Sequence, residues 1–179
     1  LCNTTAIRIS TVGYLWRNCL FLMQSLPLNN GYRFSQVELK HLPELAQFIL
    51  AHRESAVTLL EAPMGSGKTT LCNAILQAWG SEQSGSSPTF ALIEEYHGIQ
   101  GKCYHLDAYR IEDEAEAYDM GLEEYLEEGC PMWIEWGGNV RSLLPYELGV
   151  VYIRAESEAY RTVEFYPRLA VNEIQWNHE

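Results

Sequence analysis

A short run of residues in the first half of the chain has the types and spacing that bind phosphate groups. It consists of Met64, Gly65, Ser66, Gly67, Lys68, Thr69 and Thr70. Glycines let successive backbone N–H groups curve around a phosphate because no Cβ obstructs the turn. The lysine reaches the β- and γ-phosphates of a nucleotide, and the Thr69 hydroxyl is placed to ligate Mg²⁺. The run therefore predicts a site for a nucleoside triphosphate and a magnesium ion.

The sequence on either side of this run predicts the strand and the helix that position it. Residues 57–60 are apolar and β-prone, which is typical of a buried strand. Apolar residues then recur at helical spacing, at Leu71, Ala74, Ile75 and Ala78. A helix that begins at Lys68 adds its N-terminal dipole and its free N–H donors to the phosphate site. This order of strand, glycine-containing loop, Gly-Lys-Thr and helix is the P-loop, G-x-x-x-x-G-K-[ST].

One position departs from the P-loop pattern. The first glycine of the pattern falls at position 62, where this chain has Ala62. Alanine is tolerated there only if the backbone keeps a negative φ, because a Cβ disfavours positive φ. An ordinary turn and helix cap is the alternative interpretation of Gly-Ser-Gly, but the flanking strand and helix favour the P-loop.

A P-loop also needs a carboxylate at the end of a neighbouring strand, which holds Mg²⁺ directly or through water. Asp107 and Glu135 each follow an apolar run and are the two candidates, although either is also compatible with an ordinary charge at a strand end. A loop that senses the γ-phosphate is expected in residues 86–90, because Thr89 and its neighbouring serines offer hydroxyls and Pro88 fixes the backbone. A simple junction between loop and strand is the alternative for this segment.

The domain organisation is predicted to be simple, with an extension over residues 1–30 outside the core fold and one domain over residues 31–179. Residues 35–38 have the form of a helix capping box, Ser-Gln-Val-Glu. The apolar residues that follow at helical spacing are Leu42, Leu45, Ala46, Ile49 and Leu50. A helix is therefore expected to begin after this box.

Further strands are predicted after the P-loop helix. Residues 90–96 with 102–109, and residues 148–154 with 161–166, each indicate a β-hairpin. Residues 131–136 indicate a short buried strand. Hairpins add antiparallel strands to a parallel P-loop sheet. The expected fold class is therefore α/β, a single P-loop NTPase-like domain with a mixed β-sheet flanked by helices.

The chain is strongly acidic. It has 179 residues with 12 Lys plus Arg against 24 Asp plus Glu, and residues 112–128 form an acidic segment with a helical pattern and no basic residue. Tight binding to nucleic acid depends on Lys and Arg that neutralise phosphates, so this charge argues against autonomous binding and suits a basic protein partner. The five cysteines form no C-x-x-C pair and the five histidines lack metal-ligand spacing, so the sequence suggests neither a disulfide framework nor a zinc site. Reduced cysteines and a cytoplasmic location are therefore expected. No segment is long and apolar enough to predict a membrane span.

Six motifs in order together resemble one family. They are Met-Gly-Ser-Gly-Lys-Thr-Thr, Ser-Pro-Thr-Phe, Tyr-His-Leu-Asp-Ala-Tyr-Arg, Gly-Leu-Glu-Glu-Tyr, Ile-Glu-Trp and Leu-Leu-Pro. In this order and spacing the chain resembles the TsaE family, small bacterial P-loop ATPases of tRNA threonylcarbamoyladenosine biosynthesis. The resemblance runs from about residue 34 to residue 165, and residues 1–30 have no match in it.

The resemblance implies ATP as the nucleotide and assigns roles to particular residues. Thr69 and Glu135 would ligate Mg²⁺, and Asp107 would be a Walker-B-like residue that acts in catalysis or on a magnesium-bound water. Thr89 would lie in a switch-like loop near the γ-phosphate, and Trp136 would lie beside the nucleotide. Tyr109 and Arg110 complete one motif without an assigned role, and residues 35–41 would contact adenine by family position.

The resemblance also implies partners. TsaE-like proteins act with TsaB and TsaD, and TsaD transfers the threonylcarbamoyl group to adenosine of tRNAs that read ANN codons. The ATPase would support turnover of that complex and would meet tRNA only indirectly, through the complex.

Two other functions remain compatible with a P-loop. The first is a small kinase of a nucleoside or metabolite, which usually carries an arginine-rich lid over the transferred phosphate. The arginines after the P-loop are dispersed, at positions 110, 141, 154, 161 and 168. The second is a non-hydrolysing binding module in which the nucleotide only shapes a docking surface.

Overall fold

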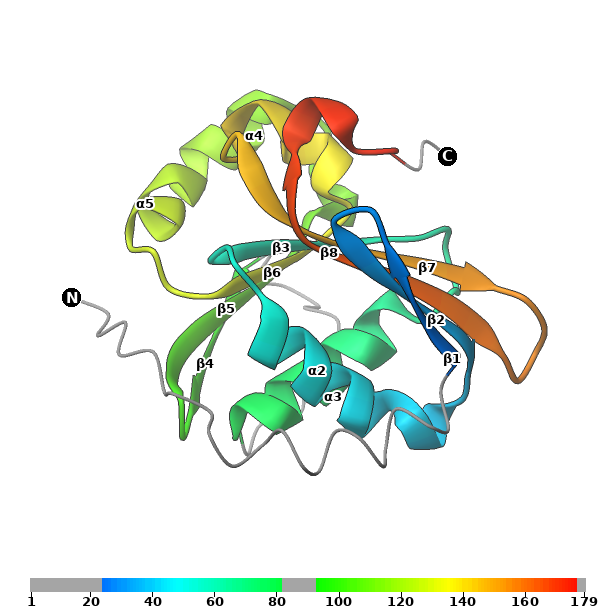
Figure 1. The fold of residues 1–179 in the computed structure, drawn as a ribbon. Helices are drawn as coiled ribbons and strands as arrows, with labels where there is room; N and C mark the ends of the chain where they lie inside the picture. Colours follow the sequence, from blue (N-terminus) through cyan, green and yellow to red (C-terminus); the bar gives the residue numbers. More distant parts are fainter. Residues whose placement is uncertain (1–23, 82–92, 177–179) are drawn as a thin grey trace.

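In the computed structural model, which describes residues 24–81 and 93–176, eight strands form one mixed sheet with helices on both faces (Figure 1). The strand order is β1-β2-β8-β7-β3-β6-β5-β4. The parallel strands are β3 (Val57–Glu61), β5 (Gly101–Asp107), β6 (Met132–Glu135) and β7 (Glu147–Ala155). The antiparallel strands are β1 (Gln24–Leu28), β2 (Gly31–Val37), β4 (Ile93–Gly98) and β8 (Arg161–Ala170). The predicted α/β class with a mixed, helix-flanked sheet is therefore confirmed.

The central strand β3 connects the fold to the phosphate-binding run. All of its residues are buried, as expected for a parallel strand that is covered on both faces. It lies between β6 and β7 and is parallel to both, so the chain leaves it at the same sheet edge at which β6 ends. Residues from β6 and β5 are thereby brought to the start of the helix that follows β3.

Helices cover the sheet from both sides (Figure 1). On one face, α2 (Leu42–His52) and α3 (Lys68–Trp79) pack on a core that includes Phe34, Leu60 and Phe165. On the other face lie α4 (Glu114–Asp119), α5 (Leu122–Glu127) and the 3-10 segment η4 (Gly137–Leu143), over a second core. Three short 3-10 segments complete the fold: η2 (Leu39–His41), η3 (Ala108–Arg110) and η5 (Val171–Glu173). Within the described residues, no helix is long and apolar enough to cross a bilayer.

The predicted capping box over residues 35–38 is wrong. These residues up to Val37 belong to β2, where Phe34 and Val37 are buried against the sheet and pair with β8. Pairing with a neighbouring strand outweighs the local capping pattern, and a bulge with φ of 55° at Gln36 lies between the paired residues Phe34 and Val37. The capping box is formed instead between Glu38 and His41. The expected helix follows as α2.

The other predicted elements agree with the structure where it describes them. The two hairpins are β4–β5 and β7–β8, the strand over 131–136 is β6, and the acidic segment forms α4 and α5. The predicted extension over residues 1–30 overlaps the sheet, because residues 24–28 form β1 and pair with β2. Residues 1–23 lie outside the described part of the chain.

Candidate functional site

The phosphate-binding run forms a loop between β3 and α3. Its glycines have the left-handed conformations that favour this residue, with φ of 74° at Gly65 and 108° at Gly67. A Cβ at either glycine would meet no atom within 4 Å, so backbone conformation rather than crowding requires glycine there. Ala62 is buried and does not adopt a positive φ. Alanine is therefore tolerated at this position of the P-loop pattern.

Lys68 is folded over the loop. It is buried, and its Nζ donates to the carbonyl of Ala62 at 2.6 Å and to that of Pro63 at 3.2 Å. The same nitrogen lies 3.8 Å from the centre of the Trp136 ring, within the range of a cation–π contact. These carbonyls and the ring are neutral partners. An anionic phosphate would offer the ammonium stronger, charge-assisted hydrogen bonds.

Thr69 and Glu135 are in direct contact. The Thr69 hydroxyl donates to Glu135 Oε2 at 3.0 Å, and the Glu135 side chain is buried. The other carboxylate oxygen, Oε1, lies 3.0 Å from Nε2 of the buried His105. Asp107 pairs with Glu135 in the register of β5 and β6, so both acidic residues end neighbouring parallel strands. Asp107 accepts a hydrogen bond from the Tyr109 backbone N–H at 3.2 Å.

A cavity of about 340 Å³ brings these groups together. Its lining residues are Met64, Gly65, Gly67, Lys68, Thr69, Thr70, Asp107, Tyr109, Glu135 and Trp136. Every site residue that the sequence predicts therefore lines this cavity, apart from Ser66 and Thr89. Ser66 lines a second cavity that also adjoins the loop, and Thr89 lies outside the described residues.

The second cavity has a volume of about 170 Å³ and adjoins the loop at Gly65 and Gly67. Its walls include Val37, Glu38 and Leu39, within the segment expected to contact adenine. Arg161 also lines it and donates from Nε to the Ser66 carbonyl at 3.0 Å, which ties β8 to the phosphate-binding loop.

Trp136 has an unusual backbone conformation, with φ of 60° in the left-handed region. Such a conformation is unfavourable outside glycine and persists only where the surroundings impose it, often at functional sites. The next residue, Gly137, packs so closely that a Cβ there would lie 2.7 Å from a methyl of Leu59. The Trp136 ring also contacts Tyr109, with ring centres 5.1 Å apart.

Sequence reasoning missed three residues of the site. His105 precedes Asp107 by two positions and so lies on the same face of its strand, a spacing that is visible in the sequence. The contact of Tyr109 with Trp136 and that of Arg161 with Ser66 depend on which strands are neighbours. Local sequence carries no signal for such contacts.

Burial and neighbouring groups act on the ionisable residues behind the cavity. Burial disfavours the charged form of His105, but Cys72 and Glu135 favour it, and their combined effect raises the pKa of His105. Burial raises the pKa of the Cys72 thiol. Cys72 and Cys103 are free thiols, as expected, but Cys130 is disulfide-bonded, so the prediction of reduced cysteines is wrong for Cys130.

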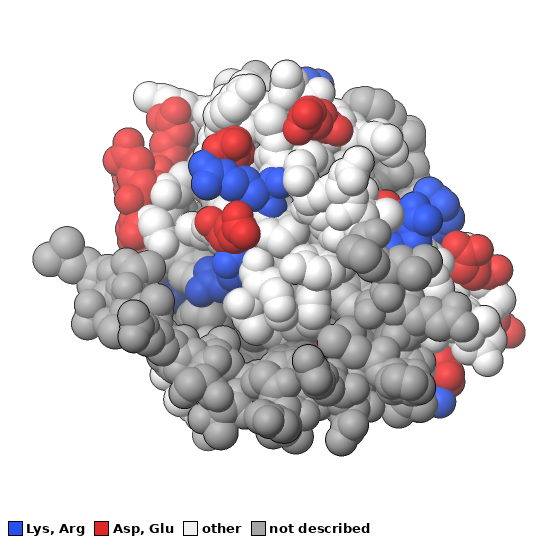
Figure 2. All heavy atoms as spheres, viewed as in Figure 1, with Lys and Arg blue, Asp and Glu red and all other residues white. Residues whose placement is uncertain are grey.

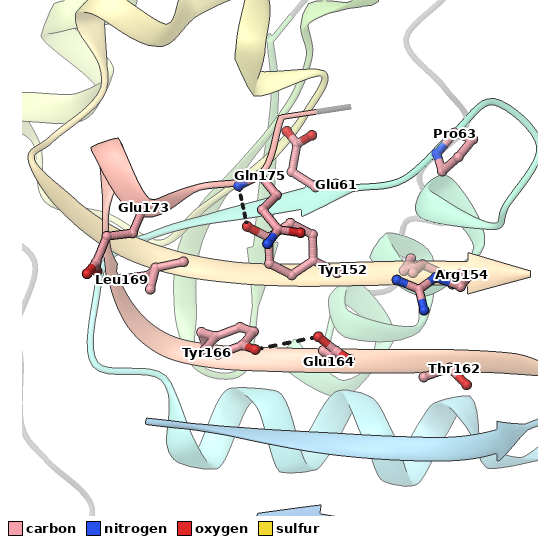
Figure 3. A pocket seen from close by; sticks show the side chains of 11 residues that line it. Glu61, Pro63, Tyr152, Arg154, Thr162, Glu164, Tyr166, Leu169, Glu173 and Gln175 are labelled. Carbon is pink, nitrogen blue, oxygen red and sulfur yellow. Dashed lines mark hydrogen bonds between the residues drawn. The ribbon is translucent and has the colours of Figure 1, made fainter. Parts of the chain in front are cut away.

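A further cavity, of about 280 Å³, lies on the sheet face opposite α3 (Figure 3). Tyr152 and Tyr166 project into it from β7 and β8, and the Tyr152 hydroxyl accepts a hydrogen bond from the Gln175 backbone N–H at 2.9 Å. It shares only Pro63 with the phosphate-binding loop and contains neither Lys68 nor Glu135. It is therefore distinct from the cavity that contains Lys68 and Glu135.

Comparison with known proteins identifies the family. The family model described as "Threonylcarbamoyl adenosine biosynthesis protein TsaE" matches residues 37–163. The TsaE protein of Bacillus subtilis is 35% identical over 109 residues, which cover 61% of this chain and 68% of the relative. The TsaE protein of Haemophilus influenzae is 36% identical over 120 residues, which cover 66% of this chain and 69% of the relative.

A solved structure supports the fold. The crystal structure of Bacillus subtilis YdiB superposes with a TM-score of 0.61 at 24% identity, over 82% of this chain and 89% of the other. The family model covers most of the described residues, including the phosphate-binding loop, Asp107 and Glu135. The chain therefore belongs to the TsaE family of tRNA threonylcarbamoyladenosine biosynthesis.

Proposed function

We propose that this protein binds ATP with Mg²⁺ in the cavity at the P-loop and hydrolyses it, in the cytoplasm, in support of a TsaB–TsaD complex. The observation that carries the proposal is the pair formed by Thr69 and Glu135 beside Lys68. Cis ligands of an octahedral Mg²⁺ with bonds of about 2.1 Å lie roughly 3.0 Å apart. Thr69 Oγ1 and Glu135 Oε2 are 3.0 Å apart, so the two side chains fit adjacent ligand positions without rearrangement.

Each residue of the cavity then has a distinct task. Thr69 and Glu135 hold the metal ion, which when bound neutralises charge on the phosphates. Lys68 would exchange its carbonyl partners for phosphate oxygens, and backbone N–H groups in the first turn of α3 would donate to the same anion. Asp107, one strand beyond Glu135, orients the attacking water. Thr89 is proposed to contact the γ-phosphate from its loop.

The second cavity suits the adenine base. It is continuous with the glycines of the loop and is walled by apolar residues, including Leu42, Ile153 and Val163. Apolar walls with a few polar groups are typical of small-molecule sites. Arg161 would hold the loop between base and phosphates through its bond to Ser66.

Phosphate release tests the proposal against its rivals. We expect slow release of phosphate from ATP that depends on Mg²⁺ and changes when TsaB and TsaD are added. A kinase would instead require a nucleoside or metabolite acceptor, and a binding module would bind ATP without turnover. Either of those results would contradict the proposal.

Trp136 provides an optical test of the site. Its ring covers Lys68, so a phosphate that draws Lys68 away changes the surroundings of the indole. We expect Mg-ATP to change the intrinsic fluorescence of the protein and the change to be lost in Trp136→Phe. The matched control is Trp176→Phe, which removes a tryptophan outside the cavity and should keep the signal. A signal that survives Trp136→Phe would contradict the placement of the nucleotide.

The acidic helix α5 is the proposed surface for a basic partner. Glu123, Glu124 and Glu127 are exposed, and Figure 2 shows acidic side chains at the upper left, where Figure 1 places α5. Only η3 and α4 separate this helix from Asp107 along the chain, so a change at the γ-phosphate has a short path to it. Glu128 is different, because it already pairs with Lys102 and accepts from the Tyr104 hydroxyl.

Charge reversal tests this surface. We expect the triple change Glu123→Lys, Glu124→Lys and Glu127→Lys to abolish association with TsaB–TsaD at low salt while ATP binding persists. The matched control reverses three exposed acidic residues elsewhere: Glu54, Glu156 and Glu173. If the α5 variant still binds in a titration as tightly as the control, α5 is only a solvated surface.

A further inference from the structure

Three side chains that commonly bind metals converge beneath the P-loop cavity. Cys72 follows Thr69 by one helical turn on α3, so both face the sheet. His105 precedes Asp107 by two residues on β5, and Glu135 ends the neighbouring strand β6. The ligand atoms of Cys72, His105 and Glu135 all lie within 4.8 Å of one another.

The three side chains are shielded from solvent. Cys72 and His105 are 0% exposed and Glu135 is 2% exposed. The Nδ1 atom of the imidazole is buried without a hydrogen-bond partner in the described part of the chain. Glu135 also lines the P-loop cavity, which gives a small ion a route to the cluster.

We propose that Cys72, His105 and Glu135 form a second divalent-metal site of the zinc class, and that an ion bound there weakens the binding of Mg-nucleotide. Thiolate, imidazole and carboxylate are the three ligand types of protein zinc sites, whereas a thiolate is a poor ligand for Mg²⁺. Tetrahedral zinc with bonds of about 2.0–2.3 Å needs donors roughly 3.3–3.6 Å apart. His105 Nε2 and Glu135 Oε1 are already 3.0 Å apart, so Cys72 Sγ is the ligand atom that would move most when zinc binds.

The inhibitory effect follows from the shared carboxylate. Glu135 presents Oε1 to His105 and Oε2 to Thr69, so zinc and magnesium would bind opposite oxygens of one side chain. Zinc draws negative charge from that carboxylate and repels a second dication close by. This effect rests on the proposed magnesium role of Glu135, whereas zinc binding itself does not.

Cobalt(II) tests whether the site exists. Metal-free protein is titrated with Co²⁺, a zinc substitute whose thiolate complexes absorb through sulfur-to-metal charge transfer. We expect this absorption in the parent and in Cys103→Ala, which removes the other free thiol among residues 24–81 and 93–176, and its loss in Cys72→Ala. Cys72→Ser serves as a second variant of nearly the same size, and melting curves verify that each variant is folded. No charge-transfer band in the parent, or an equal band in Cys72→Ala, would overturn the proposal.

Zinc loading tests whether bound zinc weakens the binding of Mg-nucleotide. Protein loaded with one equivalent of Zn²⁺ and then desalted is titrated with Mg-ATP. We expect affinity at least tenfold lower than that of the metal-free parent, the same loss in Cys103→Ala, and no loss in Cys72→Ala. Unchanged affinity in zinc-loaded parent would refute the inhibition. Failure of metal-free parent to bind Mg-ATP would instead count against the proposed function, so the two failures are distinguishable.

Discussion

Replacing Lys68 with alanine is expected to raise the dissociation constant of Mg-ATP by about 10- to 150-fold. A charge-assisted hydrogen bond contributes roughly 1.5–3 kcal/mol, and each 1.4 kcal/mol corresponds to a factor of ten. Among the lysines of the sequence, Lys40 and Lys102 are engaged elsewhere, with Glu38 and Glu128. No other lysine can therefore replace the lost contact. Isothermal titration with Mg-ATP measures the change.

The buried stem of Lys68 calls for a second variant. Alanine removes both the charge and the packing of the methylene chain against the loop, whereas Lys68→Met keeps most of the apolar volume. We expect Lys68→Met to lose ATP affinity as Lys68→Ala does, and Lys102→Ala to keep it. If folded Lys68→Met binds and hydrolyses ATP like the parent, the P-loop does not hold the phosphates.

Local sequence was sufficient to predict the strand, loop and helix of the P-loop, because the residues that determine them are close together in the chain. A buried strand, two glycines and a helix start within residues 57–71 fix the geometry, and the structure places β3 and α3 on those residues. The prediction of a capping box at residues 35–38 was wrong for the opposite reason. Its pattern is local, but Phe34 and Val37 are buried by pairing with β8, more than a hundred residues away.

From the residue pattern alone, the metal ligand was predictable only up to the choice between two carboxylates, and only the family resemblance favoured Glu135. Both follow apolar runs, and sequence does not reveal the order of the strands. In the structure β6 lies between β3 and β5, so Glu135 meets Thr69 while Asp107 stands one strand farther away. The same strand order creates the contact between His105 and Glu135, and brings Cys72 to it. Neither contact follows from spacing along the chain alone.

This difference in position predicts that the two carboxylates have separable roles. Glu135→Gln keeps the size of the side chain but removes the charge that a metal ion needs, so the Mg²⁺ concentration for tight nucleotide binding should rise at least tenfold. Asp107→Asn should leave that concentration nearly unchanged. It should reduce turnover by about 10²- to 10⁴-fold, the usual range for a residue that assists proton transfer from water.

Titration of Mg²⁺ against each variant at fixed ATP, followed by phosphate release at saturating Mg²⁺, measures both effects. Isosteric amides are preferable to alanine here, because Glu135→Ala would leave His105 and Thr69 without their carboxylate partner and would confound folding with metal binding. Melting curves of the two variants show whether they are equally folded. Identical magnesium profiles would mean that both carboxylates hold the ion. A loss of turnover confined to Glu135→Gln would assign the water-orienting role to Glu135 and leave Asp107 as an ordinary charge at a strand end.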